Sequence, residues 1–306
     1  IHAIENQLSP LLMGEDPERI GWLINKMDRL PRNPASKTAL DMALHDLVGN
    51  VVSVPAYKLL GGLSKEEVPI AEAVGTNDPE EAAKKAVELV EEGFSVLKAK
   101  IGFNPRVDVK IVKAVREAVG DEIKIWFDAN ASYRPKTAIR LIRKIERYEP
   151  FCIEQPVGPR EDLKGMAEVV RATDIPIMAD ESVFTPSDAL SIVEMRAADM
   201  LAIKFVKCGG MFKAKRIAAI AETAGIPCMM ISTYGTGLCI SANAHVAAST
   251  ENIIFCNMRE PKKSEKWIKT GLAREGDKLR VSSREGLGVQ LMEDIFLRQD
   301  EQRMPV

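Results

Sequence analysis

The chain alternates short apolar runs with longer amphipathic stretches over most of its length. From about residue 68 there are eight apolar runs of strand length, and stretches of about 10–15 residues with helical spacing of apolar residues lie between them. The apolar runs are residues 69–74, 95–101, 123–128, 150–153, 176–179, 199–205, 226–231 and 252–256. Strands that alternate with helices in this way predict a parallel sheet.

The repeat length favours a closed barrel. Strand starts recur about every 25 residues, which fits one strand and one helix per unit. Eight such units predict an α/β protein with a TIM-type βα barrel, and an open doubly wound sheet is the alternative. We assign residues 68–260 to the barrel, residues 1–67 to the helical part of a capping domain, and residues 261–306 to a C-terminal segment that returns to the cap.

The region before the barrel has a helical pattern. Asp16 and Pro17 predict a helix start, because Asp caps helices and Pro suits their first turn. Residues 34–48 predict a second helix, which Gly49 ends. The apolar residues expected to form its buried face are Leu40, Ala43, Leu44, Leu47 and Val48.

Composition excludes several classes of protein and partner. Hydrophobic residues make up 46% and charged residues 28% of the chain, which argues against disorder and fibrous proteins. The formal net charge of −2 argues against a nucleic-acid or acidic-membrane partner held by bulk electrostatics. No apolar run reaches the roughly 18–20 residues that span a bilayer, and the first residues lack the pattern of a signal peptide. The sequence does not begin with Met, so we expect the natural N-terminus to lie outside it.

The cysteines and histidines predict no metal site of their own. Five cysteines are an odd number and form no CxxC motif, so we expect reduced thiols in a cytoplasmic protein. Three scattered histidines are too few for a metal site built on imidazole.

Ionisable residues end five successive predicted strands. Active sites of βα barrels lie at the carboxyl ends of the strands, so these side chains are expected at one rim. The residues, in chain order, are Lys98, Lys100, Asp128, Glu154, Asp180 and Lys204. Asp128 and Glu154 are 26 residues apart, as are Glu154 and Asp180, and Lys204 follows after 24 more. A lone residue of this kind is usually a helix cap or a solvated strand end, but the whole set at one-unit spacing is hard to explain in that way.

The three carboxylates predict a metal site, and the lysines predict acid–base groups. Converging carboxylates repel one another and need a counter-charge, for which Mg²⁺ is the expected ion and Mn²⁺ the alternative. Side chains alternate along a strand, so Lys98 and Lys100 share a face, and Lys204 points into the barrel with Ala202. Strands 2 and 6 are opposite in a ring of eight, so Lys100 and Lys204 would flank whatever the metal holds.

This set of groups suits removal of a proton from a carbon next to a carboxylate. The product of that step is a dianionic enediolate, and general acid–base catalysis, worth about 10²–10⁴-fold, does not suffice for it. A preorganised cation at the developing charge supplies more. Lysine is a weak base at its ordinary pKa near 10.4, and we expect neighbouring positive charges to lower the lysine pKa values here.

These residues resemble motifs of the enolase superfamily, in particular the muconate-lactonizing-enzyme subgroup of the mandelate racemase/muconate lactonizing enzyme family. The matching segments are residues 97–102, 127–130, 153–156, 179–182 and 203–210, with 39–47 and 59–62 before the barrel. The resemblance covers nearly the whole chain. It implies a modified, enolase-like C-terminal barrel with an α+β capping domain.

The resemblance also implies roles for individual residues. It places Mg²⁺ on Asp128, Glu154 and Asp180, with Lys100 and Lys204 as opposed acid and base. Lys98 would polarise the substrate carboxylate and Glu181 would lie behind the metal ligands. Enolase-superfamily sites are known to combine a Lys or His base with Mg²⁺, so this agreement is part of the resemblance. We also assign Asn130 to substrate binding and expect a homo-oligomer.

Two departures from the family pattern bear on the substrate, which is expected to be a small carboxylate. Members of this family usually begin with a β-rich part of the cap that supplies specificity loops, and we expect that part to be absent or to lie outside this sequence. Dipeptide epimerases of the subgroup have an Asp-x-Asp signature at strand 8, where this chain has Cys256-Asn257-Met258-Arg259. We therefore do not expect a free amine of the substrate to bind at this strand. We expect Arg259 to pair with a second anionic group of the substrate instead.

Several activities fit this set of groups. Racemisation or epimerisation uses both lysines, while muconate-type cycloisomerisation and syn-dehydration of a hydroxy acid use the same parts. A lyase that forms a Schiff base on a barrel lysine is a further alternative, against which the three carboxylates argue. A barrel that only binds a ligand is the non-enzymatic alternative.

Overall fold

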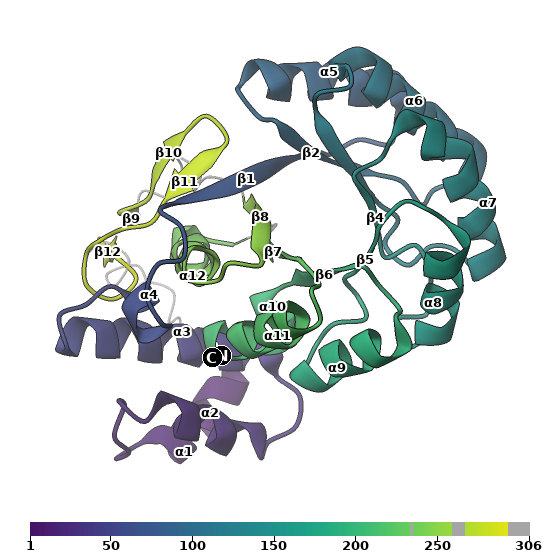
Figure 1. The fold of residues 1–306 in the computed structure, drawn as a ribbon. Helices are drawn as coiled ribbons and strands as arrows, with labels where there is room; N and C mark the ends of the chain where they lie inside the picture. The colour runs from purple at the N-terminus through teal and green to yellow at the C-terminus, as the bar shows by residue number, and fades with distance from the viewer. Residues whose placement is uncertain (233–234, 259–266, 293–306) are drawn as a thin grey trace, which may run out of the picture.

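A computed structural model describes residues 1–232, 235–258 and 267–292 of the 306-residue chain. Its centre is a ring of eight parallel strands, in which β1 pairs with both β2 and β8 (Figure 1). The strands are β1 (Glu67–Val74), β2 (Val96–Lys100), β3 (Lys124–Asp128), β4 (Cys152–Glu154), β5 (Ile177–Ala179), β6 (Met200–Ile203), β7 (Cys228–Ser232) and β8 (Ile253–Met258). The prediction of a closed barrel is confirmed, and the open sheet was the wrong alternative.

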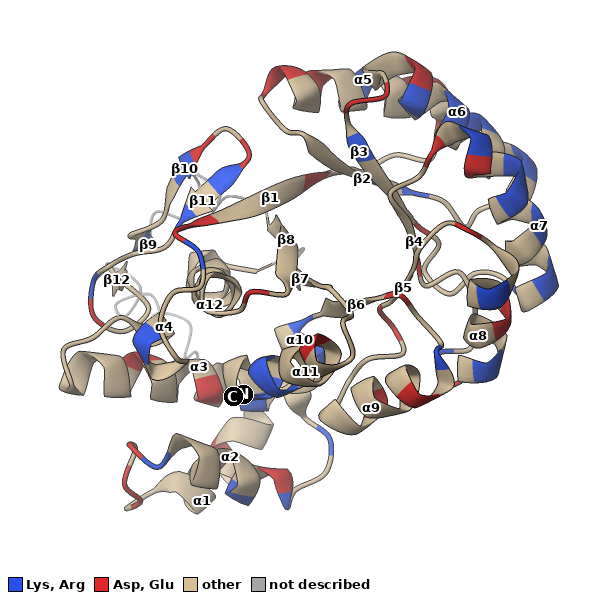
Figure 2. Cartoon of the chain, viewed as in Figure 1, with Lys and Arg blue, Asp and Glu red and all other residues tan. Residues whose placement is uncertain are grey.

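Helices surround the ring, and many Lys, Arg, Asp and Glu residues lie on them (Figure 2). They are α5 (Pro79–Glu91), α6 (Pro105–Val119), α7 (Pro135–Ile145), α8 (Leu163–Ala172), α9 (Pro186–Met195), α11 (Met211–Thr223) and α12 (Gly237–Ala248). Helix starts follow local chemistry: Asp78 accepts backbone N–H bonds from the first turn of α5, and Thr185 and Asp188 form a reciprocal capping pair on α9. Helix α12 has no periodic pattern, because residues on all its sides are buried.

Apolar residues fill both the inside of the barrel and the space between its strands and the outer helices. Inward side chains from alternating strand positions, among them Trp126, Met200 and Ala202, form a cluster inside the ring. Leu201 and Ile203 belong instead to the larger cluster between strands and helices. The predicted alternation along this strand is therefore correct, and Ala202 faces inward.

The sixth strand is shorter than predicted. It ends at Ile203, and the short helix α10 (Phe205–Cys208) follows directly. The backbone carbonyl of Lys204 accepts bonds from the N–H groups of Lys207 and Cys208, so the chain turns into a helix at Lys204. Lys204 thus lies at a strand-to-helix junction.

Residues 1–60 are largely helical, as predicted, with different boundaries. The elements are η1 (Ile4–Leu8), α1 (Ser9–Leu12), α2 (Ile20–Asp28), α3 (Pro34–Val51) and α4 (Ala56–Leu59). No helix starts at Asp16, whose carboxylate accepts the N–H of Glu18 at 2.9 Å within a turn. Gly49 does not end α3: a Cβ there would lie 2.7 Å from the Cα of Gly286, so this glycine permits a close backbone approach.

The buried face of α3 differs from the predicted one. Ala43 is exposed and Leu47 is 48% exposed, whereas polar residues of the same helix are buried. Thr38 donates to the carbonyl oxygen of Phe205 at 2.6 Å, and the carboxylate of Asp41 accepts the N–H of Met211. Polar contacts with α10 and α11 therefore fix how α3 lies on the barrel, which apolar spacing does not indicate.

The described C-terminal part forms small strands beside the barrel. They are β9 (Ile268–Thr270), β10 (Ala273–Glu275), β11 (Lys278–Arg280) and β12 (Val289–Leu291), of which β11 pairs antiparallel with β1. The N–H of Leu287 donates to Asp46 on α3 at 2.7 Å. The predicted domain boundaries at residues 67 and 260 stay predictions. Among the described residues, no helix combines the length and apolar character needed to cross a membrane.

We predict a pH-dependent stability from His245 on α12. Its ring stacks on Tyr57 at 5.6 Å between centroids, and burial lowers the pKa of His245 to about 4. Because this pKa lies below the unfolded value of about 6.5, the neutral ring stabilises the fold fully above pH 6.5. As pH falls from 6.5 to 4, about 3 kcal/mol of that stability is lost.

Urea unfolding of the wild type and of His245→Gln at several pH values checks this. The variant should be less stable at pH 7, and its own loss between pH 6.5 and 4 should be smaller by about 3 kcal/mol. Equal losses in the two proteins would contradict the assignment.

Candidate active site

Five barrel strands bring ionisable side chains to the same rim. Parallel pairing places Lys100 opposite Asp128 and Asp128 opposite Glu154, at the carboxyl ends of β2, β3 and β4. Asp180 follows β5 directly and Lys204 follows β6. The one-unit spacing of the sequence thus becomes a cluster of charges at one end of the barrel.

Lys98 lies between two buried carboxylates. Its Nζ is 2.9 Å from Asp128 Oδ2 and 2.6 Å from Glu154 Oε2, and its side chain is 5% exposed. Both carboxylates are fully buried. Lys98 also lies over the Trp126 ring, 5.8 Å from its centroid. A buried ammonium with two carboxylate partners compensates charge that would otherwise be very unfavourable there.

Lys100 reaches the same cluster from the more exposed side. Its Nζ is 2.6 Å from Asp128 Oδ2 and also donates to the side-chain oxygen of Asn130. Lys98 and Lys100 therefore share a face, in agreement with the predicted alternation. Asn130 in turn donates to Glu181 at 3.0 Å, so the predicted residues Asn130 and Glu181 contact each other beside Lys100.

Among the three carboxyl groups, Glu154 is the one whose pKa is raised. Burial raises the pKa of Glu154 to about 8; nearby Lys98 opposes that shift, and Asp128 and Asp180 add to it. Trp126 Nε1 donates to Glu154 Oε2 at 2.9 Å, while the other oxygen, Oε1, is buried without a hydrogen-bond partner among the described residues. Glu154 is therefore the one of the three that binds a proton most readily.

Asp180 has two ammonium partners. Lys204 contacts one carboxylate oxygen, and Lys207 contacts the other oxygen as well as the backbone carbonyl. Burial alone would raise the pKa of Asp180, but Lys207 and Lys204 outweigh it and hold this pKa well below its usual range. Asp180 is therefore ionised at neutral pH.

The pKa values of Lys98 and Lys204 shift in the opposite direction to the one predicted. Burial lowers the pKa of Lys98 and of Lys204, but the carboxylates that face them outweigh burial and raise both values above the ordinary one. Lys207 beside them has a lowered pKa, because its burial outweighs the attraction of Asp180 and the charge of Lys204 acts in the same direction as burial. We predicted that neighbouring positive charges would dominate. For Lys98 and Lys204 this was wrong, because the carboxylates in direct contact with them have the larger effect on the pKa.

The residues at this rim fit a hard divalent cation. Three carboxylates provide the oxygen ligands that Mg²⁺ prefers, and the unpartnered Glu154 Oε1 is a buried acceptor that a cation would satisfy. As they lie, no three His, Cys, Asp or Glu side chains of the described ranges are grouped around one ion position. Lys98 and Lys204 contact oxygens of the same carboxylates, so a cation bound there would compete with these ammonium groups.

Sequence reasoning missed several residues of this site. Lys207 was missed although it lies three residues after Lys204, a spacing that puts both on one side of a helical turn. Gln155 accepts the N–H of Asp180 at 2.9 Å and donates to Ser182 at 2.9 Å, so it fixes the end of β5 relative to β4. Its place directly after Glu154 was the available signal. The predicted substrate ligand Arg259 lies outside the described residues.

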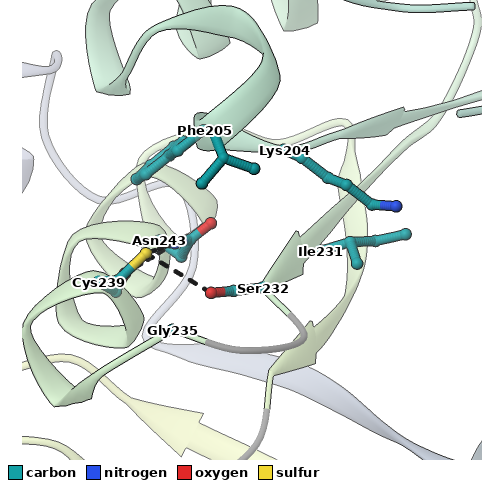
Figure 3. Close-up of a pocket in the computed structure, with 8 residues that line it drawn as sticks. Lys204, Phe205, Ile231, Ser232, Gly235, Cys239 and Asn243 are labelled. Atoms are coloured by element: carbon teal, nitrogen blue, oxygen red, sulfur yellow. Dashed lines mark hydrogen bonds between the residues drawn. The ribbon is translucent and has the colours of Figure 1, made fainter. Parts of the chain in front are cut away.

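A cavity adjoins Lys204 (Figure 3). It has a volume of about 360 Å³ and lies between α10, the end of β7 and α12. Three of its lining residues are apolar, namely Phe205, Val206 and Ile231. Three others carry neutral polar groups, namely Ser232, Cys239 and Asn243. The rim therefore combines a charged cluster with an adjacent, mostly apolar space.

We predict that Lys98→Met makes the metal-free protein less stable by about 3–5 kcal/mol, because two buried carboxylates lose a shared counter-charge. Saturating Mg²⁺ should then raise the melting temperature of the variant more than that of the wild type, since no ammonium competes for the carboxylates. Differential scanning calorimetry with and without Mg²⁺ measures both effects. The exposed Lys110→Met is the control, and an equal response of all three proteins to Mg²⁺ would refute the carboxylate site.

Two family models match the chain. "Mandelate racemase / muconate lactonizing enzyme, N-terminal domain" matches residues 1–61, and "Enolase C-terminal domain-like" matches residues 81–295. The matched residues include both the helical region before the barrel and every strand of the ring from β2 to β8.

Curated relatives of known activity are similar to this chain. The L-Ala-D/L-Glu epimerase of Clostridium acetobutylicum is 38% identical over 85% of this chain and 73% of its own length. The hydrophobic dipeptide epimerase of Enterococcus faecalis is 41% identical, over 79% and 68%. The N-succinyl-L-Arg/Lys racemase of Bacillus cereus is 34% identical, over 96% and 79%. A muconate cycloisomerase of Rhodococcus opacus is 34% identical, over 82% and 68%. All four names are those of isomerases.

Solved structures agree with this fold. The Bacillus cereus racemase has a TM-score of 0.92 at 32% identity, covering 97% of this chain and 80% of that one. The Enterococcus faecalis dipeptide epimerase complexed with Mg and L-Leu-L-Tyr has a TM-score of 0.86 at 36% identity, covering 92% and 80%. The chain therefore belongs to the mandelate racemase/muconate lactonizing enzyme family of the enolase superfamily.

Proposed function

We propose that this chain is a Mg²⁺-dependent isomerase that removes the proton α to a substrate carboxylate and returns a proton to the same carbon. Racemisation or epimerisation is the reaction that the site supports best. The observation that carries the proposal is the arrangement of Lys100 and Lys204, which reach the carboxylate cluster from strands on opposite sides of the ring. The isomerase relatives support the same class of reaction.

Opposed lysines give a stereochemical outcome that a single base does not. One amine takes the α-proton from its side of the substrate carbon, and the ammonium on the other side donates a proton to the opposite face. The carbon is inverted. The lysine that acted as base is left as an ammonium, and the lysine that acted as acid is left neutral. Each lysine serves as base for one enantiomer and as acid for the other.

The remaining residues hold charge. Asp128, Glu154 and Asp180 would bind Mg²⁺, which supplies positive charge against the enediolate. Lys98 stays an ammonium, because its pKa is raised by Glu154 and Asp128 even against burial, and it adds a second positive group at the substrate carboxylate. Lys204 is held as an ammonium while Asp180 faces it, so its use as a base requires that contact to loosen.

The substrate class follows from the same groups. A small carboxylate fits a rim with four lysines and a cation site, and the names of the relatives offer dipeptides and N-acylated amino acids as the compounds to screen. A cytoplasmic location and a homo-oligomer remain our predictions from the sequence.

We predict that single lysine variants distinguish proton transfer on one face of the substrate α-carbon from proton transfer on the other. In deuterium oxide the wild type should exchange the α-hydrogen of both enantiomers and racemise them. Lys100→Ala and Lys204→Ala should each lose racemisation by about 10²–10⁴-fold, because one of the two proton-transfer groups is gone. Each variant should still exchange the α-hydrogen of one enantiomer, and the two variants should prefer opposite enantiomers.

Proton NMR of N-acyl amino acids and dipeptides, with product analysis on a chiral column, measures both quantities. The exposed Lys110→Ala serves as the matched control and should behave as the wild type. Full racemisation by both site variants would refute the two-base reaction. Formation of a keto acid instead of the other enantiomer would identify a dehydratase.

A further inference from the structure

The cavity beside Lys204 contains an acceptor that nothing in the described protein satisfies. Asn243 lies on α12, is fully buried and forms part of the cavity wall. Its Nδ2 donates to the carbonyl oxygen of Cys239 at 2.7 Å and lies 3.3 Å from the Cys239 sulfur. Its Oδ1 has no hydrogen-bond partner among the described residues.

The orientation of this amide follows from chemistry. The carbonyl oxygen of Cys239 only accepts hydrogen bonds, so the amide nitrogen of Asn243 must face it and the amide oxygen must face away. Figure 3 shows this oxygen pointing away from Cys239, toward the space enclosed by Phe205, Ile231 and Ser232. A buried acceptor left unpaired is unfavourable, so its partner is expected to come with a ligand.

The cavity lies where a substituent on the reacting carbon would extend. The proposed function puts the α-carbon within reach of Lys204 Nζ, whose other neighbour is the carboxylate of Asp180. Because Lys204 also lines the cavity, a group on that carbon can extend into it. Its volume of about 360 Å³ is in the range of small-molecule sites.

We propose that this cavity receives the α-substituent of the substrate, and that Asn243 Oδ1 selects an uncharged substituent with an N–H or O–H donor. The inference rests on the proposed function. It deepens that function because it names the substrate class: α-carboxylates with a neutral, donor-bearing side chain, of which a carboxamide is the simplest example.

The lining explains why the substituent is neutral. Phe205, Val206 and Ile231 give the cavity apolar walls, and the described polar groups on it other than Lys204 are uncharged. Lys204 is the charged group among the described lining residues, and in the proposed function its amine is engaged at the reacting α-carbon rather than at the far end of the substituent. A charged substituent would lose its hydration here without gaining a counter-ion, whereas a carboxamide loses less and gains the acceptor of Asn243.

Three near-isosteric ligands test this directly. N-acetyl-L-glutamine has a neutral donor, N-acetyl-L-methionine is apolar, and N-acetyl-L-glutamate is charged. Isothermal titration calorimetry of the Mg²⁺-loaded full chain should give a dissociation constant for the glutamine compound about tenfold or more below those of the other two. In Asn243→Leu the preference for glutamine over methionine should fall to about twofold or less.

A matched control is available on another helix. Asn50 also donates its Nδ2 to the carbonyl four residues earlier, that of Asp46, at 2.7 Å, but lies at the surface of α3. Asn50→Leu should keep the wild-type preference. Circular dichroism checks that both variants fold; where Asn243→Leu does not fold, the wild-type comparison of the three ligands decides, with Asn243→Ala as the second variant.

The results separate this inference from the proposed function, because calorimetry needs no turnover. A glutamine preference that depends on Asn243, without α-hydrogen exchange in deuterium oxide, would sustain the cavity assignment and refute the isomerase. α-Hydrogen exchange together with equal binding of the glutamine and methionine compounds would support the isomerase and refute the cavity assignment. A preference unchanged in Asn243→Leu, or no binding by any of the three compounds at millimolar concentration, would overturn the inference.

Discussion

Charge compensation at the rim of the barrel is the interaction on which the site depends. Asp128, Glu154 and Asp180 are fully buried, and such a trio is unfavourable unless positive groups face it. Lys98 bridges two of the carboxylates, and Lys204 contacts the third. The same groups that stabilise the metal-free protein are those that the proposed reaction uses. A divalent cation would therefore take over charge compensation that ammonium groups perform, and would free Lys204 for proton transfer.

The barrel makes this compensation possible through its register. Each βα unit returns the chain to the same rim, so residues about 25 positions apart in sequence become neighbours in space. The apolar layers inside and outside the ring fix the strands. Residues that directly follow the strands complete the arrangement, as Gln155 does by holding the backbone of Asp180. Precise placement of charge is thus a property of rigid strand ends.

The sequence allowed prediction of the barrel and of which residues meet, because both follow from the βα period. It did not allow prediction of features set by contacts between distant segments. Hydrogen bonds of Thr38 to α10 and of Asp41 to α11 determine which face of α3 is buried. Apolar spacing instead predicted burial of Leu47, which is exposed. The pKa directions of Lys98, Lys204 and Lys207 depend on the balance between burial and the charges that face each ammonium, which spacing alone does not give. Helix α12 has no amphipathic pattern because it is buried on all sides. Neither the cavity that it lines nor the role of Asn243 there could therefore be predicted from the sequence.

Anomalous diffraction from crystals grown with Mn²⁺ tests the central claim most directly, because this ion replaces Mg²⁺ at oxygen sites and has its own anomalous signal. The account predicts one strong peak between Asp128, Glu154 and Asp180, with the ammonium groups of Lys98 and Lys204 moved off the carboxylate oxygens that they contact in the metal-free protein. A peak elsewhere, or none at saturating Mn²⁺ with both lysines still against the carboxylates, would contradict it.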